Sequence, residues 1–292
     1  MVDSAVLNNI LIFGPVFLLI AARALAMIQV APLLSSDAIP QVAKIALAGL
    51  AAFAVIPTAE AFHVAANNPN AIVTLPGGSL SDLRHEVFSL RFLLLIAGEA
   101  MIGIIIGFYM TIIFASFSTA GQFFSLQMGF GASETFDPVA QVENPLMGQY
   151  FNLVAMLIFV TIGGFHELFF GGFWRSVQTI NVISLIEGTE PVVTMIVSGL
   201  TRLFLDAIII ALPILGTLFL TSLTTGLISK ASPQVNILSE GFPISIITAF
   251  VLLLTVLPFM IEAFTRIINA GFGSFQNLYI QIGRQITGGG GI

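Results

Sequence analysis

The sequence has no cysteine and very little charge. Of its 292 residues, 9 are Lys or Arg and 15 are Asp or Glu, so 8% are charged and the formal net charge is −6. Without cysteine, disulfides, thiol catalysis and thiolate metal sites are excluded. Soluble domains carry about 25% charged residues, and nucleic-acid-binding proteins need a basic surface. The composition therefore argues against a soluble domain and against a nucleic-acid partner.

The sequence is rich in apolar residues. They make up 57% of the sequence, and the mean hydropathy is +1.03. The 27 Phe far outnumber the 3 Tyr and the single Trp, so the aromatic side chains are mostly apolar rather than of the amphipathic interfacial kind. We interpret the chain as an integral membrane protein in which Phe serves as packing material or as part of a gate.

Six long apolar runs divide the sequence, and each can supply the about 20 residues that a membrane-spanning helix needs. The runs are 5–31, 45 to about 66, 92–117, 146–173, 192–223 and 244–264. Residues 1–4 are acidic where a signal peptide would be basic, so we expect the first run to be retained. The second run is interrupted by Pro57 and Glu60. The fifth contains Arg202 and Asp206, whose i,i+4 spacing predicts a buried pair within one helix. Broken or charged membrane helices are tolerated only where protein or a water-filled cavity receives them.

Residues suited to catalysis or metal binding are few and scattered. His63, His85 and His166 lie far apart in the sequence, and only His166 has a neighbouring carboxylate, Glu167. We interpret His166 as a packed or interfacial histidine rather than as a metal ligand or a base. The paired glycines of the chain lack the lysine and the strand-turn-helix context of a phosphate-binding loop. We predict no catalytic residue, no metal site and no cofactor.

Two glycines and two charged residues within the apolar runs indicate close helix contacts. Gly103 and Gly107 have the GxxxG spacing, which places two bare patches of backbone on one helix face for a partner helix. Glu99 lies one turn earlier, and a carboxylate there must be paired, protonated or in contact with water. The alternative is that the membrane helix begins later in the sequence, so that Glu99 reaches the membrane surface. Arg23 has no local acid, so we predict that its partner lies on another helix or another chain.

The segment that follows the third run is apolar, aromatic and rich in glycine. Met128, Phe130 and Phe136 supply soft bulk, while Gly129 and Gly131 permit unusual backbone angles. A loop of this kind can pack into a constriction and leave it again, and hydrophobic constrictions gate by excluding water. The alternative is a re-entrant loop that only fills space between helices.

A polar connection, broken twice by proline, joins the last two runs over residues 226–243. Its polar residues alternate with apolar ones, a pattern that a solvent loop does not need, and proline leaves backbone groups to be paired elsewhere. We therefore predict the buried or partner-facing tip of a helical hairpin. The residues singled out in this tip are Lys230, Pro233, Gln234, Asn236 and Glu240.

Three separated blocks of residues occur in a characteristic order from Arg23 to Pro243, which is most of the chain. The first is Arg23 with 31–34 and 39–40; the second is Glu99, Gly103, Gly107, Phe108, Gly121, Gln127, Met128, Gly129, Asp137 and Pro138; the third is Leu212, Pro213, 230–236 and 241–243. In their order and spacing they resemble the FliR/SctT family of type III export gate membrane subunits. The chain departs from the family pattern at Lys230, where arginine is usual and a bidentate contact is lost. Its loop at 67–86 also looks longer than usual in the family.

The resemblance implies an all-α membrane protein whose apolar segments form bent helical hairpins in a helical multi-subunit assembly. Residues 1–287 would form a single export-gate domain, FliP-like to about residue 190 and FliQ-like from about residue 191. The four glycines at 288–291 predict a flexible tail over 288–292. The implied partners are several copies of FliP-type and FliQ-type membrane subunits, an FlhB-type switch subunit, membrane lipid and unfolded export substrates. The implied location is the bacterial inner membrane at the flagellar basal body.

Two sets of residues carry the functional hypotheses. The resemblance places a pore-plugging loop at Met128, Gly129, Phe130, Gly131 and Phe136. We further hypothesise that subunits are held together by Arg23, Glu99, Gly103, Gly107, Lys230, Pro233, Gln234, Asn236 and Glu240. The implied function is that of a single-copy, non-enzymatic gate subunit through which unfolded flagellar proteins pass.

Three alternatives remain open at this stage. The first is an injectisome export-gate subunit. The second is a small-solute secondary transporter, in which broken helices and midplane charges are also expected, but which should show two related halves that this sequence lacks. The third is a passive membrane scaffold, which needs neither a flexible aromatic loop nor a GxxxG face near an acid.

Overall fold

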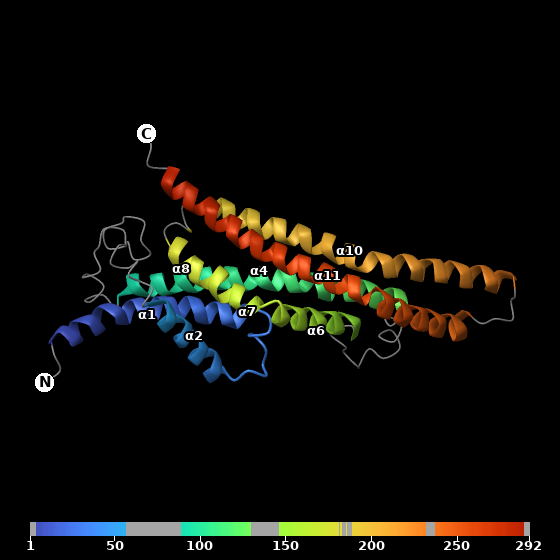
Figure 1. Ribbon diagram of the computed structural model, residues 1–292, viewed down its shortest axis with the longest axis horizontal. Helices are drawn as coiled ribbons and strands as arrows, with labels where there is room; N and C mark the ends of the chain where they lie inside the picture. The colour runs from blue at the N-terminus through green and yellow to red at the C-terminus, as the bar shows by residue number, and fades with distance from the viewer. Residues whose placement is uncertain are drawn as a thin grey trace. The chain divides into compact units, whose positions relative to one another are not determined.

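The computed structural model describes residues 4–56, 89–129, 146–180, 182, 185, 189–231 and 237–288. Every regular element within these ranges is a helix, so the prediction of an all-α chain is confirmed for them. Two compact units are built from segments that are distant in the sequence, and Figure 1 labels their helices. Unit 1 comprises Met1–Thr111, Gly164–Val197 and Gly271–Ile292, and unit 2 comprises Ile112–Gly163 and Ser198–Ala270.

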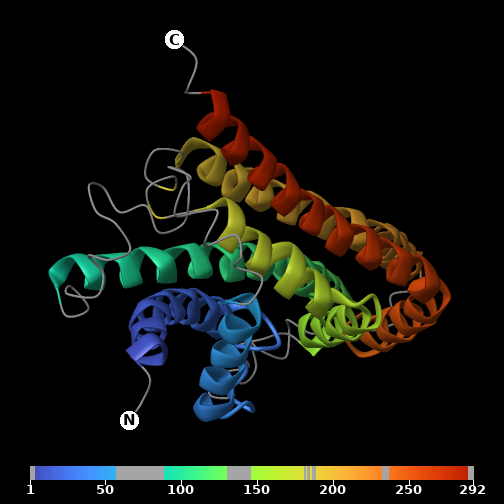
Figure 2. The ribbon, with the colours of Figure 1, turned by 60° about the vertical axis from the view of Figure 1, so that its left-hand side comes forward.

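Unit 1 begins with two apolar helices, α1 (Ser4–Val30) and α2 (Gln41–Val55), which lie against each other (Figure 2). Pro40 stands directly before α2 with φ −62° and ψ 145°, the extended backbone that a proline ring favours. The buried Lys44 donates from Nζ to the carbonyl oxygen of Ser35 over 2.9 Å, so its charged head is bonded to the connection between α1 and α2. This contact anchors the connection to α2.

The long helix α4 (Leu90–Met128) contributes residues to both units. Its start is set by Ser89, whose Oγ accepts a hydrogen bond from the backbone N–H of Phe92 over 3.2 Å, an N-cap contact. No proline interrupts its 39 residues. It ends at Met128, and Gly129 follows with a φ of 86°, the left-handed conformation that glycine commonly supplies after a helix.

The segment after α6 (Leu146–Thr161) changes its helical form several times. Gly163 interrupts it with φ 75°, a conformation that glycine adopts at little cost. The chain then forms three short helices in succession. They are the α-helix α7 (Gly164–His166), the π-helix η3 (Glu167–Trp174) and the α-helix α8 (Arg175–Thr179). Ile180 ends this series with extended backbone at φ −118° and ψ 121°.

The last two helices are long and contain internal prolines. They are α10 (Thr189–Ala231), with Pro213, and α11 (Ile237–Gly288), with Pro243 and Pro258. Hydroxyl groups of α10 bond to carbonyls four residues earlier, as in the 2.9 Å bond from Thr217 Oγ1 to Pro213 O. Such bonds satisfy polar side chains inside an apolar helix without a partner from elsewhere.

The helices of the described ranges give fewer candidate membrane spans than the six apolar runs. By length and composition, three helices within the described ranges can cross a membrane: Leu90–Met128, Thr189–Ala231 and Pro243–Ile282. A fourth is possible if Leu146–Thr161 and Gly164–Thr179 together make one span. The first two runs yield the shorter apolar stretches Gly14–Val30 and Gln41–Val55. The count of six spans is therefore not confirmed, and the interruption at Pro57 and Glu60 lies outside the described residues.

Several phenylalanine rings pack against one another in the core of unit 2. Phe117 packs against Phe264 with ring centroids 4.4 Å apart, and Phe151 stacks on Phe124 at 5.9 Å. Phe114 adds an edge-to-face contact with Phe159 at 5.5 Å. All of these rings except that of Phe114 are at most 1% exposed, and Phe114 is 3% exposed. In this unit phenylalanine is therefore packing material, which is one of the two roles expected from the composition.

Candidate functional site

The GxxxG face of α4 meets α1 within the same chain. A Cβ atom on Gly103 would collide with the carbonyl oxygen of Arg23 and lie 3.0 Å from Ala26 Cβ. A Cβ atom on Gly107 would lie 2.9 Å from both Met27 O and Val30 Cβ. Real Cβ atoms essentially never show separations under 3.0 Å, which a Cβ atom would have at both positions, so both glycines are needed for the approach of the two backbones.

Gly103→Ala is expected to destabilise the chain by about 1–3 kcal/mol, because the added methyl group overpacks the contact between α1 and α4. Thermal unfolding of the purified chain in mild detergent, followed by fluorescence of its single tryptophan, measures the effect. The matched control is Gly14→Ala on α1, where a Cβ atom would meet nothing within 4 Å. Equal unfolding temperatures for the two variants would contradict the close contact.

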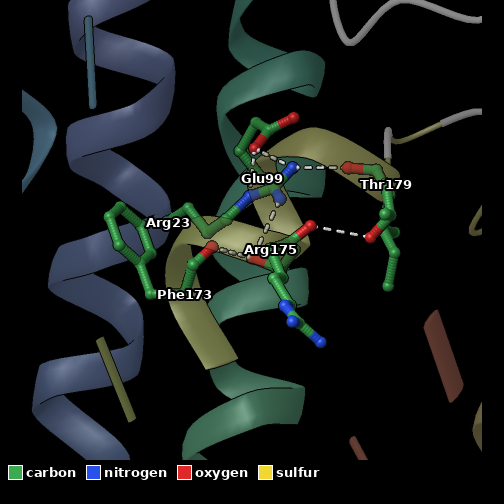
Figure 3. A network of polar contacts seen from close by, with 7 residues as sticks. Arg23, Glu99, Phe173, Arg175 and Thr179 are labelled. Carbon is green, nitrogen blue, oxygen red and sulfur yellow. Dashed lines mark hydrogen bonds and ion pairs between the residues drawn. The ribbon is translucent and has the colours of Figure 1, made fainter. Parts of the chain in front are cut away.

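Arg23 and Glu99 form a buried ion pair between the same two helices (Figure 3). Arg23 is 0% exposed and Glu99 is 3% exposed. The Nε and Nη2 atoms of Arg23 each lie 2.6 Å from Oε2 of Glu99. The partner of Arg23 is therefore on another helix of this chain. A buried pair of this kind is retained only if further hydrogen bonds satisfy its remaining polar atoms.

Those further hydrogen bonds come from the segment that follows η3. Arg23 donates from Nη1 to Ser176 Oγ over 3.2 Å and from Nη2 to the carbonyl oxygen of Ile180 over 2.9 Å. Ser176 in turn donates from Oγ to Phe173 O over 2.6 Å. Figure 3 shows Arg23 reaching from α1 to Glu99 on α4, with Phe173 and Arg175 on the neighbouring helical segment. We call Arg23, Glu99, Ser176 and Ile180 the Arg23 cluster.

Sequence reasoning selected Arg23 and Glu99 but missed Ser176 and Ile180. The ion pair is detectable in principle, because a charge in an apolar run requires a partner. Ser176 is one serine among many, and Ile180 takes part through its backbone carbonyl, which carries no residue-specific signal. The hypothesis that Arg23, Glu99, Gly103 and Gly107 hold neighbouring subunits stays a prediction, since the contacts described here are within one chain.

The expected pore plug lies mostly outside the described residues. Met128 is the last residue of α4 and is 0% exposed, and Gly129 follows it with φ 86°. Phe130, Gly131 and Phe136 fall in a range that the structure does not describe.

The hairpin tip is described only at its margins. Lys230 is exposed in the last turn of α10, and Glu240 lies in the first turn of α11. Pro233, Gln234 and Asn236 are outside the described residues. The residues assigned to the tip therefore stay predictions.

The other charged and ionisable candidates can be placed on their helices. His166 is exposed, and its ring stacks on Phe170 with centroids 4.7 Å apart. Among the described residues no group of three His, Cys, Asp or Glu side chains could hold a metal ion. Arg202 is exposed and Asp206 is half-buried in the chain. This face of α10 is not covered by the chain itself, so the predicted burial of the pair is not seen within the chain and stays a prediction for an assembly.

Comparison with known proteins identifies the family. The family described as bacterial export proteins, family 1, matches residues 15–271. The chain belongs to this family. Among the relatives of this export family, the flagellar biosynthetic protein FliR of Escherichia coli (strain K12) is 29% identical over 255 residues, which are 85% of this chain and 87% of that protein. FliR of Bacillus subtilis (strain 168) is 25% identical over 279 residues, or 95% of this chain and 99% of that protein.

The chain is also similar to a protein that is not named FliR. The surface presentation of antigens protein SpaR of Shigella sonnei is 27% identical over 173 residues, which are 59% of this chain and 65% of SpaR. The chain is thus similar to proteins of both names. The longer matches are to the FliR proteins.

Proposed function

We propose that this member of the bacterial export family is a single-copy, non-enzymatic subunit of the flagellar type III protein export gate, and that it forms part of the pore for unfolded flagellar proteins. The observation that carries the proposal is the family match over residues 15–271, which includes parts of both compact units. An injectisome export gate is the second candidate, because SpaR is also a relative. The FliR relatives match a larger share of the chain, 85% and 95% against 59% for SpaR, and this favours the flagellar gate.

The partners in this proposal are membrane proteins that cover the two last helices. In the most apolar stretch of α4, 61% of the residues are buried within the chain, against 28% in α10 and 17% in α11. Exposed apolar surface of this extent marks an interaction site or a membrane contact. Large exposed side chains on these helices include Leu205, Ile209, Leu212, Leu220, Ile247, Leu254 and Phe259. In our proposal several FliP-type and FliQ-type subunits cover this surface together with membrane lipid, and an FlhB-type switch subunit contacts the assembled gate.

We also propose that the chain has two parts, each similar to one of the two smaller partner types. Residues 1–287 act as one export-gate domain, FliP-like to about residue 190 and FliQ-like over 191–287, with 288–292 as a flexible tail. The FliQ-like part corresponds to most of α10 and α11, and its tip at 226–243 would stand at the cytoplasmic entrance of the gate. The assembly would sit in the inner membrane at the flagellar basal body.

Two roles are proposed for the residues selected from the sequence. Met128, Gly129, Phe130, Gly131 and Phe136 would form the plug of the closed pore. The tip residues Lys230, Pro233, Gln234, Asn236 and Glu240 would contact neighbouring subunits directly. Arg23, Glu99, Gly103 and Gly107 would contribute to the interface by holding α1 against α4, so that the outer surface of unit 1 keeps the shape its neighbours require.

Purification of the tagged chain in mild detergent tests the partners. We expect it to be recovered in one copy with several copies of two smaller membrane proteins, as measured by native mass spectrometry. A chain recovered alone that binds a metabolite would favour the secondary transporter. A chain recovered alone without a ligand would contradict an obligate gate subunit and favour a scaffold.

Pro233→Ala is expected to weaken this complex. Proline restricts the backbone, so its removal would make the tip more flexible and the tip would bind its neighbours less tightly. The measurement is the ratio of small subunits to the tagged chain after purification. Pro40→Ala is the matched control, since Pro40 stands directly before α2 and outside both the tip and the exposed surface of α10 and α11. A normal ratio in the Pro233→Ala complex would rule out the interface role of the tip.

A further inference from the structure

The π-helix η3 stands directly before the segment that completes the Arg23 cluster. A π-helix is rare and is mostly an α-helix with one extra residue in a single turn, and it is frequently found at functional sites. The N–H of Arg175 closes η3 by bonding to Phe170 O, five residues earlier, and shares this bond with Gly172 O. Ser176 and Ile180 follow within five residues of this point, so their positions depend on the form of η3.

The carbonyl oxygen of Gly172 has a second partner from a distant part of unit 1. Tyr279, on the C-terminal segment of α11, donates from its hydroxyl to Gly172 O over 2.7 Å. Tyr279 is 5% exposed, and its ring stacks on Phe275 with centroids 6.4 Å apart. Phe275 also contacts Tyr109 of α4 edge-on at 5.1 Å. The hydroxyl of Tyr279 is therefore held in place by packed aromatic rings while it bonds to the widened turn.

A change of η3 from π to α form would move everything that follows it. One residue corresponds to a rotation of roughly 100° about the helix axis and a shift of about 1.5 Å along it. Such a rotation would turn Ser176 Oγ away from Arg23 Nη1 and displace the Ile180 carbonyl from Arg23 Nη2. The buried guanidinium would then keep Glu99 and lose its other two described acceptors.

We propose that the Tyr279 hydroxyl is a latch that holds η3 in its π form and thereby sets the register in which Ser176 and Ile180 meet Arg23. Tyr279 is a positioning residue, because it acts on the Arg23 cluster through η3 and does not touch Arg23 in the described contacts. The latch makes η3 an element with two registers, and it connects the C-terminal segment of α11 to the ion pair between α1 and α4. The inference rests on contacts within unit 1 and does not depend on the proposed function.

A disulfide reporter can read the register, because the chain contains no cysteine of its own. An ideal Cβ atom on Gly98 lies 3.2 Å from the Cβ of Val182, close to the about 3.5–4.5 Å that a disulfide requires. Gly98 neighbours Glu99 on α4, and Val182 follows Ile180. The pair Gly98→Cys and Val182→Cys, in the full chain in native membranes, should form a disulfide only in the present register.

In this background Tyr279→Phe is expected to reduce the yield of the disulfide several-fold, while the amount of chain in the membrane stays unchanged. The matched control is Tyr109→Phe, which removes a hydroxyl from the same aromatic cluster; within the described residues that hydroxyl donates no bond to η3. Its disulfide yield should equal that of the parent. Equal yields in the parent and in Tyr279→Phe, or equal losses in both tyrosine variants, would overturn the latch.

Deletion of Gly171 distinguishes the register from a general loosening of the structure. The deletion removes the extra residue of the turn, so an α-form segment would place Ser176 where the π form places it now. Combined with Tyr279→Phe, the deletion should restore the disulfide to the yield of the parent. A combined variant that accumulates normally and stays poorly cross-linked would contradict the register explanation.

Discussion

Glu99→Ala is expected to destabilise the folded chain by about 3–5 kcal/mol, because it leaves the Arg23 guanidinium buried without its counter-charge. Arg23 is 0% exposed and bonds to the carboxylate over 2.6 Å, so water cannot replace the lost partner. The thermal unfolding of the purified chain in detergent measures the loss, with Trp174 in η3 as the only tryptophan and therefore as a specific fluorescent probe.

Two comparisons isolate the effect of burial. The first is Glu262→Ala, which removes an exposed pair with Arg266 whose side chains are 63% and 74% exposed, and exposed pairs contribute about 0–1 kcal/mol. The second is the double variant Arg23→Met with Glu99→Leu, which removes both charges and should recover much of the stability lost in Glu99→Ala. Equal unfolding of Glu99→Ala and Glu262→Ala would contradict the importance of the buried pair.

Deletion of residues 127–136 is expected to cause a large increase in ion leakage through the assembled gate. The deleted stretch contains the apolar bulk of Met128, Phe130 and Phe136, and a hydrophobic constriction excludes ions by excluding water. Met128 is the last residue of α4, and Gly129 follows it with the left-handed φ of 86°. The measurement is the conductance of purified gates in a planar bilayer.

The control for this deletion is a second deletion of the same length, residues 67–76, in the long polar loop to which no role is assigned. Its conductance should match that of the unaltered gate. An unchanged conductance after deletion of 127–136 would remove the plug hypothesis, and a leak in both variants would assign the effect to general disruption of the assembly.

The long helices could be predicted from the sequence, but their ends could not. The apolar run predicts a helix over residues 192–223, whereas α10 continues to Ala231. The added turns contain serine and threonine, and hydroxyls such as Thr225 Oγ1 bond to the carbonyl four residues earlier over 2.8 Å. Helix α11 likewise continues from the apolar run to Gly288. Hydropathy marks where a membrane can be crossed, and a helix can extend beyond that point.

The candidate site was predictable in its charges and glycines and not in its connections. Gly103 and Gly107 carry a spacing that indicates close contact, and Arg23 and Glu99 stand out as charges in apolar runs. Arg23 and Glu99 are 76 residues apart in sequence, so nothing local identifies them as partners. The π form of η3 and the hydrogen bond from Tyr279 to Gly172 O depend on packing between distant segments. No residue pattern in the sequence predicts either of them.

The most direct test of the account is the export of flagellar filament protein by a strain of the source bacterium that lacks this chain. We predict that the filament protein is absent from the culture medium, that the cells have no filaments, and that the unaltered chain restores both. Normal filaments in the deletion strain, with only another type III secretion system lost, would contradict the flagellar assignment in favour of an injectisome. Normal export by every such system in the deletion strain would contradict the role of this protein as an export-gate subunit.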